Sequence, residues 1–168
     1  MTQHHTFTSR DHRFQVALPA FALAEMVRLA QAAGQDETGG ILVGQYTPDH
    51  RTALITRAEP PPSDSRSGPT WFQRGVTGVK DILNRLWIAP TRTYYLGEWH
   101  YHPHASASAS RTDDHTMKCS ELRDGFGCAE PILVILGGDP YGAVHLHAYV
   151  FPTPVTRVQL FEEESRGT

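Results

Sequence analysis

The 168-residue sequence has few cysteines, no excess of charge of one sign and no long apolar run. Cys119 and Cys128 are too few and too far apart for a disulfide framework or a CxxC metal site. We expect both to be reduced thiols, with Cys119 in a helix and partly buried. The 15 Lys and Arg residues against 18 Asp and Glu leave a formal charge of -3. This balance argues against nucleic acid as a partner, because such binding requires a basic surface.

No stretch approaches the about 18 consecutive apolar residues that a membrane-spanning helix needs. The N-terminal sequence MTQHHTFTSRDHRFQV is polar and lacks the apolar region of a secretory signal. We therefore expect a cytoplasmic protein with no membrane partner. Since 39% of the residues are hydrophobic, the chain can form one core, and we predict a single domain over residues 1–168. Within it, residues 1–13 are expected to be a loose segment, with His4 and His5 disordered.

Apolar periodicity predicts a mixture of helices and strands without internal repeats. Predicted strands cover residues 14–18, 39–46, 54–56, 94–102, 131–138 and 142–151, with hairpins joining the second to the third and the fifth to the sixth. Predicted helices cover residues 19–34, 72–86 and 110–124, and a Pro- and Ser-rich surface loop covers 60–69. Because no steady βαβ alternation appears, the pattern favours an α+β fold in which helices flank a mixed sheet.

Histidines and aspartates are concentrated in the segment GEWHYHPHASASASRTDD. On a strand, His100 and His102 lie two residues apart and project from one face. Ser110 is a good helix N-cap, which places Asp113 in the first turn of the following helix. Two imidazoles and one carboxylate suit Zn²⁺, and a set of three protein ligands leaves a fourth position for water, as in catalytic sites. We predict one zinc ion per chain, held by His100, His102 and Asp113.

Hydrolysis at such a site also needs a base that is not a metal ligand. Glu37, in the segment DETGGILVG, is the best candidate. A carboxylate at the start of a buried strand is unusual, and the following glycines allow another backbone to approach closely. Glu98 competes for this role, but it shares a strand face with His100 and is better suited to support that histidine.

Glu37, the H-x-H-P motif that begins at His100 and the S-x-x-D motif that begins at Ser110 together resemble the signature of the JAMM (JAB, MPN+) metalloproteases. The resemblance implies a JAB/MPN fold of cytidine-deaminase-like architecture and zinc held by His100, His102 and Asp113. It also implies Glu37 as general acid/base and Ser110 as the group that stabilises the oxyanion. Members of this family cleave isopeptide or peptide bonds after the C-terminus of ubiquitin or ubiquitin-like proteins.

The segments ETGGILVGQY, WFQRG and YYLGEWHYHP resemble the stand-alone prokaryotic JAB proteins of antiphage operons. These relatives accompany E1- and E2-like enzymes in CBASS signalling or in bacterial ubiquitin-like conjugation. The resemblance implies an isopeptidase that reverses a conjugation, with a ubiquitin-like protein or a conjugated nucleotidyltransferase as substrate. Two alternatives stay open: a JAB peptidase that processes a sulfur-carrier protein, and a zinc-free MPN scaffold. The complete set of ligands and base disfavours the scaffold.

The sequence also gives expectations for other polar and aromatic residues. Candidate substrate contacts are Trp71, Phe72, Arg74 and Tyr101, the last of which stands where many family members have Ser or Thr. Expected surface or supporting residues are His104, His115 and the solvent-facing Asp114, while His145 and His147 form a second same-face pair that no carboxylate follows at useful spacing. We expect an extended substrate tail to add to an exposed sheet edge beside the predicted strand 94–102.

Overall fold

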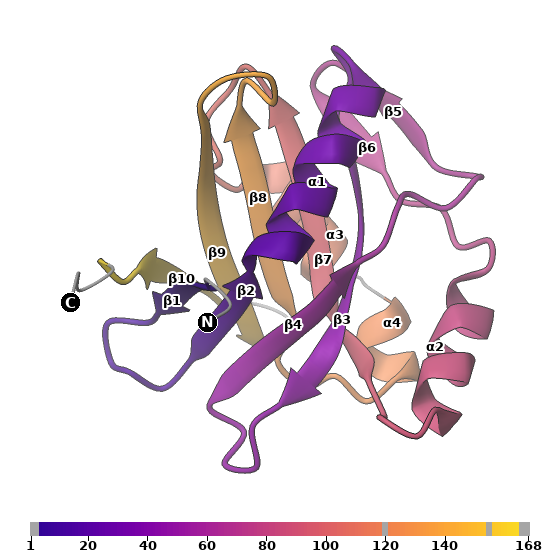
Figure 1. Cartoon of the computed structure of the whole chain (residues 1–168), viewed down its shortest axis with the longest axis vertical. Helices are drawn as coiled ribbons and strands as arrows, with labels where there is room; N and C mark the ends of the chain where they lie inside the picture. The colour runs from indigo at the N-terminus through magenta and orange to yellow at the C-terminus, as the bar shows by residue number, and fades with distance from the viewer. Residues whose placement is uncertain (1–3, 119–120, 154–155, 165–168) are drawn as a thin grey trace.

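A computed structural model describes residues 4–118, 121–153 and 156–164 of the chain. In this part, eight strands close into a barrel in the order β1-β10-β9-β8-β7-β3-β4-β2, and β5 pairs with β6 in a separate two-stranded sheet (Figure 1). The strands are β1 (His4–Thr8), β2 (Gln15–Pro19), β3 (Thr38–Tyr46), β4 (Thr52–Ala58), β5 (Arg66–Gly68), β6 (Trp71–Gln73), β7 (Tyr94–Pro103), β8 (Ile132–Gly138), β9 (Val144–Thr153) and β10 (Thr156–Glu162). The helices are α1 (Ala20–Ala33), α2 (Val79–Ile88), α3 (Arg111–Lys118) and α4 (Glu121–Gly125).

The barrel sheet is mixed, as the sequence predicts. β2 pairs with β4 and β7 pairs with β8 in parallel, whereas the other neighbouring strands are antiparallel. Both predicted hairpins, β3 with β4 and β8 with β9, are confirmed. The α+β class is therefore confirmed, although closure of the sheet into a barrel was not predicted.

α1 crosses the front of the barrel in Figure 1 and packs against its main core. Ala22, Met26 and Ala30 recur at four-residue intervals, so one face of the helix is buried. The helix begins after Pro19 and ends at Gly34, whose positive φ of 69° is accessible to glycine without strain.

A bulge at Gly97 decides which side chains of β7 face the site. The register with β3 shifts here, so Leu96 and Trp99 both enter the main core while Tyr95 packs in a second cluster with α2 and α4. Gly97 has a φ of 152°, and a Cβ on it would lie 1.8 Å from the Ile132 carbonyl oxygen. The alternate residues from Glu98 onward consequently face away from the main core.

The N-terminal residues differ from the predicted loose segment. β1 pairs with β2 on one side and with β10 on the other, and Phe7 is 1% exposed in the main core. His4 and His5 belong to this strand, and His5 Nδ1 lies 2.6 Å from the Glu162 carboxylate. The expectation of disorder is wrong for these residues, because β1 pairs with the nearby β2 and with β10 from the other end of the chain.

The predicted helix over residues 72–86 begins too early. Residues 71–73 form β6, which pairs with β5 inside the predicted 60–69 loop, and α2 begins only at Val79. Gly78 precedes it with a φ of 78°, and the Asp64 carboxylate accepts the amides of Val76 and Thr77 at 3.0 and 2.9 Å. These side-chain contacts replace the hydrogen bonds of a first helical turn.

The expected sheet edge beside β7 is also wrong. β7 is hydrogen-bonded to β3 on one side and to β8 on the other, so no substrate strand can add to it. Within the described residues, β5 and β6 pair only with each other.

The predicted helical segment 110–124 contains α3 and α4, and Cys119 lies outside the described residues between them. Cys128 is a free, buried thiol. Among the described residues, no helix has the length and apolarity needed to cross a membrane.

Candidate metal and catalytic site

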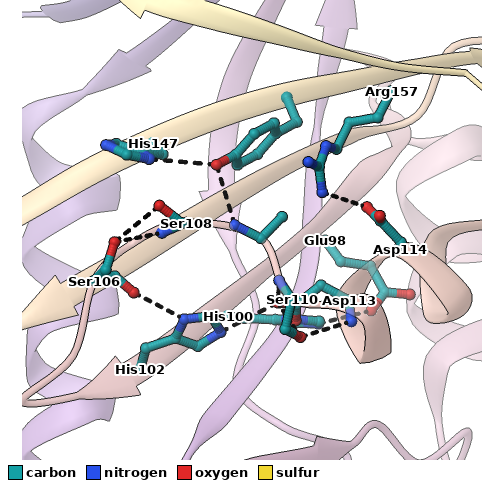
Figure 2. A network of polar contacts seen from close by, with 12 residues as sticks. Glu98, His100, His102, Ser106, Ser108, Ser110, Asp113, Asp114, His147 and Arg157 are labelled. Atoms are coloured by element: carbon teal, nitrogen blue, oxygen red, sulfur yellow. Dashed lines mark hydrogen bonds and ion pairs between the residues drawn. The ribbon is translucent and has the colours of Figure 1, made fainter.

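The end of β7 and the start of α3 bring together the three predicted ligands (Figure 2). His100 Nδ1 lies 2.6 Å from Asp113 Oδ1, and His102 Nε2 lies 3.3 Å from Asp113 Oδ2. All three residues are buried, with 1%, 7% and 4% exposure for His100, His102 and Asp113. The alternation of β7 places both imidazoles on one face, as predicted from their spacing.

Ser110 caps α3 and holds Asp113 in place. The Ser110 amide and hydroxyl donate to Asp113 Oδ2 at 2.7 and 2.8 Å, and the Asp113 amide donates back to Ser110 Oγ at 3.1 Å. This reciprocal arrangement satisfies amides at the helix start and orients the carboxylate toward the histidines.

The serine-alanine loop after β7 orients His102. Its Nδ1 lies 3.0 Å from the Ser106 carbonyl oxygen, which can only accept, so Nδ1 carries a hydrogen and Nε2 faces Asp113. The loop passes directly over Gly137 of β8, where a Cβ would lie 2.6 Å from the Ala105 carbonyl oxygen. Glycine at 137 is therefore needed for the loop to pack here.

His100 contacts a second buried carboxylate. Glu98 is fully buried, and its Oε2 lies 3.5 Å from His100 Nε2. Its other oxygen, Oε1, accepts a hydrogen bond of 2.9 Å from Arg74 Nε. Glu98 thus lies beside the predicted ligand His100, as its position two residues away predicts.

Glu37 precedes β3 directly and is half-buried. Thr38 pairs with Tyr101, so Glu37 lies near the level of His102 on the adjacent strand. The Glu37 amide also donates to the Gly68 carbonyl at 2.9 Å, which joins the end of β5 to the site. Burial raises the pKa of the Glu37 carboxyl, while His102 opposes this shift and Asp113 adds to it.

Charges around the histidines favour a cation at this position. Burial alone would lower the pKa of His100, but contacts to the Asp113 and Glu98 carboxylates raise it to about 9. Burial would also lower the pKa of His102, but its contact with Asp113 outweighs burial and raises this pKa overall. For Asp113 itself, burial acts to raise the pKa, but contacts to both histidines lower it overall. The carboxylates therefore stabilise positive charge between them.

The donor types fit a zinc ion, since two imidazoles and one carboxylate converge here. Within the described part of the chain, however, no three His, Cys, Asp or Glu side chains are arranged to hold a metal ion as they stand. Asp113 instead contacts both histidines directly.

Of the four candidate substrate contacts, only Trp71 is exposed, at 45%. Phe72 is buried, and its ring meets the His100 ring edge-to-face at 5.6 Å. The Arg74 side chain forms a buried ion pair with Glu98. Tyr101 is fully buried in the main core, so this residue alters packing and is not available to a substrate.

The remaining polar residues take up varied positions. His104 and His115 are exposed, as expected. Asp114, expected to face solvent, is half-buried and forms an ion pair of 2.7 Å with Arg157 of β10. His145 and His147 lie across β8 from the site histidines, since Gly137 pairs with both His102 and His145, and Ile135 with both His100 and His147.

Three features of the site were not predicted from the sequence: the Arg74–Glu98 ion pair, the Ser106 carbonyl on His102 and the Phe72 ring on His100. Arg74, the one charged residue in the segment WFQRG, is the one local signal for the first. The other two depend on tertiary packing and have no local signal.

Comparisons with known proteins show the family of this chain. The family model described as prokaryotic homologs of the JAB domain (Prok-JAB) matches residues 19–150. A protein of Enterobacter hormaechei subsp. hoffmannii (strain UCI 50) named "CD-NTase/cGAS isopeptidase" is 40% identical over 157 residues, which cover 94% of this chain and 86% of the relative.

The solution structure of protein DSY2949 from Desulfitobacterium hafniense is similar in fold, with a TM-score of 0.57 and 18% identity over 86% of this chain and 87% of that one. The fold, the motif order and the family match agree, and the chain belongs to the prokaryotic JAB family.

Proposed function

We propose that this protein is a zinc-dependent isopeptidase that releases a CD-NTase from the protein to which it has been conjugated. The observation that carries the proposal is the convergence of His100, His102 and Asp113 next to a half-buried Glu37. The name of the 40% identical relative supports the substrate class. The conjugate would be made by E1- and E2-like enzymes of an antiphage system, and both reactions would occur in the cytoplasm.

His100, His102 and Asp113 would hold the zinc ion. When bound, the ion supplies Lewis acidity, which activates water as a nucleophile near neutral pH. Ser106 and Glu98 contact the two imidazoles on the sides facing away from Asp113, and such contacts orient ligands and select their tautomers.

Glu37 is the proposed general base and acid. Burial raises the pKa of its carboxyl, so this group accepts a proton more readily than an exposed glutamate does. It would take the proton of the attacking water and pass it to the leaving lysine amine. Ser110 would donate to the oxyanion; its hydroxyl donates to Asp113 in the structure and would turn from it to do so.

The substrate tail would approach along β5 and β6, which pair only with each other within the described residues. The end of β5 is hydrogen-bonded to Glu37, and Trp71 of β6 is exposed. Backbone hydrogen bonds to a free strand would hold a flexible tail extended without requiring a particular sequence.

The proposal is tested with a purified conjugate in which the C-terminus of a CD-NTase is joined to a lysine of a second protein. We expect zinc-loaded protein to release intact CD-NTase, seen by gel and by intact mass. Removing the metal with a chelator should stop the release, and added zinc should restore it. A sulfur-carrier precursor serves as the comparison substrate. Cleavage of that precursor, with no release of CD-NTase, would instead favour processing of a sulfur carrier.

A further inference from the structure

A charged pair is buried directly beside the site. Glu98 is fully buried, and the Arg74 side chain that contacts it at 2.9 Å is only 9% exposed. The cost of removing both ions from water is about as large as the attraction between the charges returns. Two apolar residues would fill the same space at no greater cost, so stability alone gives little reason for this pair.

Two buried atoms, one in the pair and one beside it, have no hydrogen-bond partner among the described residues. These are Glu98 Oε2 and His100 Nε2, both fully buried and 3.5 Å apart. The opposite ring nitrogen of His100, Nδ1, faces Asp113 at 2.6 Å. One ring nitrogen of His100 therefore faces the predicted ligand Asp113, and the other faces Glu98. A movement of a few tenths of an ångström would make the Glu98 contact a normal hydrogen bond.

We propose that Arg74 and Glu98 are positioning residues for His100. Arg74 fixes the Glu98 carboxylate in place, and Glu98 accepts the N–H on the side of the imidazole that faces away from Asp113. This contact selects the tautomer that leaves the lone pair of the other nitrogen for the metal. The inference rests on the zinc site of the proposed function, but it concerns residues outside the predicted ligand set.

Arg74 also connects the ligand to the segment around β5 and β6. Its Nη1 donates to the Gly75 carbonyl at 2.6 Å, and the Gly75 amide donates to Ser65 Oγ at 2.9 Å. Phe72, two residues before Arg74, packs edge-to-face on His100. The orientation of His100 therefore depends on the position of this segment, whereas His102 depends on the serine-alanine loop.

The test compares zinc affinity in four proteins, measured by competition with a chelator of known affinity. They are the wild type, Arg74→Met, the double variant Arg74→Met/Glu98→Met, and Arg157→Met as the control. The control removes an arginine from a 2.7 Å ion pair to Asp114, on the same helix as Asp113, without touching a predicted ligand. We expect zinc affinity to fall about 10- to 100-fold in Arg74→Met and in the double variant, and to stay unchanged in Arg157→Met.

The double variant keeps the test decisive, because a single Arg74→Met leaves Glu98 buried without its partner and can unfold the protein. In the double variant both charges are gone, so the fold should survive while the zinc defect remains. Cobalt replaces zinc as a spectroscopic probe, and its visible absorption should change in the double variant if His100 has turned. A fifth protein, Arg74→Lys, keeps the positive charge, and we expect it to bind zinc more tightly than Arg74→Met does.

A double variant that binds zinc as tightly as the wild type, with the same cobalt spectrum, would overturn the positioning role. That result would leave the proposed function intact. Failure of the wild type itself to bind zinc would instead remove the proposed function, and the positioning role with it.

Discussion

The two ends of the paired strands β3 and β7 carry different kinds of side chain on the same face of the sheet: charged at one end and mainly apolar or aromatic at the other. At the end where Thr38 pairs with Tyr101, the face holds buried charged groups. At the end where Gly44 pairs with Tyr94, it borders a cavity of about 840 Å³. The side chains that line this cavity are mainly aromatic or apolar, and they include Tyr46, Leu83, Trp87, Tyr94, Tyr95, Phe126 and Cys128.

The proposed site lies at the charged end, outside this cavity, and the two ends are stabilised in different ways. The apolar end is stabilised by burying hydrocarbon surface, which is non-directional and tolerates varied packing. At the charged end, Glu98, His100, His102 and Asp113 each contact a group of opposite charge or a hydrogen-bond partner. Such groups are costly to bury and are tolerated only when they are paired, so their concentration indicates function.

The sharpest test of the charged end is Glu37→Ala. We expect turnover of the conjugate to fall by about 10²- to 10⁴-fold, because the general base is removed. The fold and zinc content should be unchanged, since Glu37 is not a predicted ligand. Single-turnover rates and metal analysis of the same preparation measure both. A variant that loses its zinc would identify Glu37 as a ligand and require another base.

Ser110→Ala should have a smaller effect on turnover, about 10²-fold, as expected for the loss of one oxyanion donor. The same change removes a cap of α3 and should lower the free energy of unfolding by about 1 kcal/mol. Rates under saturating substrate, together with urea unfolding, separate the two effects. A loss of stability with no change in kcat would limit Ser110 to its capping role.

Leu83→Ala tests the apolar end. Leu83 is 2% exposed in the second cluster, so its truncation should lower the free energy of unfolding by about 2–5 kcal/mol. The rate per folded molecule at the charged end should stay within about twofold, because distant sites act independently. Denaturant unfolding and active-site titration measure these quantities. A large fall in kcat at full occupancy of the folded state would mean that the two ends are coupled.

The smallest expected effect is the reactivity of Cys128. Burial raises the pKa of its thiol to about 11, so at pH 8 only about one molecule in 10³ carries the nucleophilic thiolate. We expect no alkylation of Cys128 in the folded protein and rapid alkylation in urea, as located by peptide mass spectrometry. Fast labelling under native conditions would show that the cavity end opens readily.

The parts of the fold and site that local patterns encode were predicted from the sequence. The two-residue spacing of His100 and His102 predicted their common face, and the Ser110 cap predicted the place of Asp113, as the structure has them. α1 and both hairpins follow from apolar periodicity with glycine and proline boundaries, and they are confirmed.

The parts that were missed depend on contacts between distant segments. Phe7 pairs with Glu162, so closure of the barrel has no local signal. The expectation of a free edge beside β7 failed because β3 and β8 pair with its two sides. The start of α2 was misjudged because Asp64 binds amides 12 and 13 residues away. The ion pair of Arg74 with Glu98 joins residues 24 positions apart, so no local pattern could predict it.

The central claim is that the charged end of β7 is a catalytic zinc site, and zinc content per chain tests it most directly. Elemental analysis of purified protein after dialysis against zinc should give about one ion per chain for the wild type and none for His102→Ala, which removes a predicted ligand. Equal zinc content in the two proteins, or none in the wild type, would contradict the account.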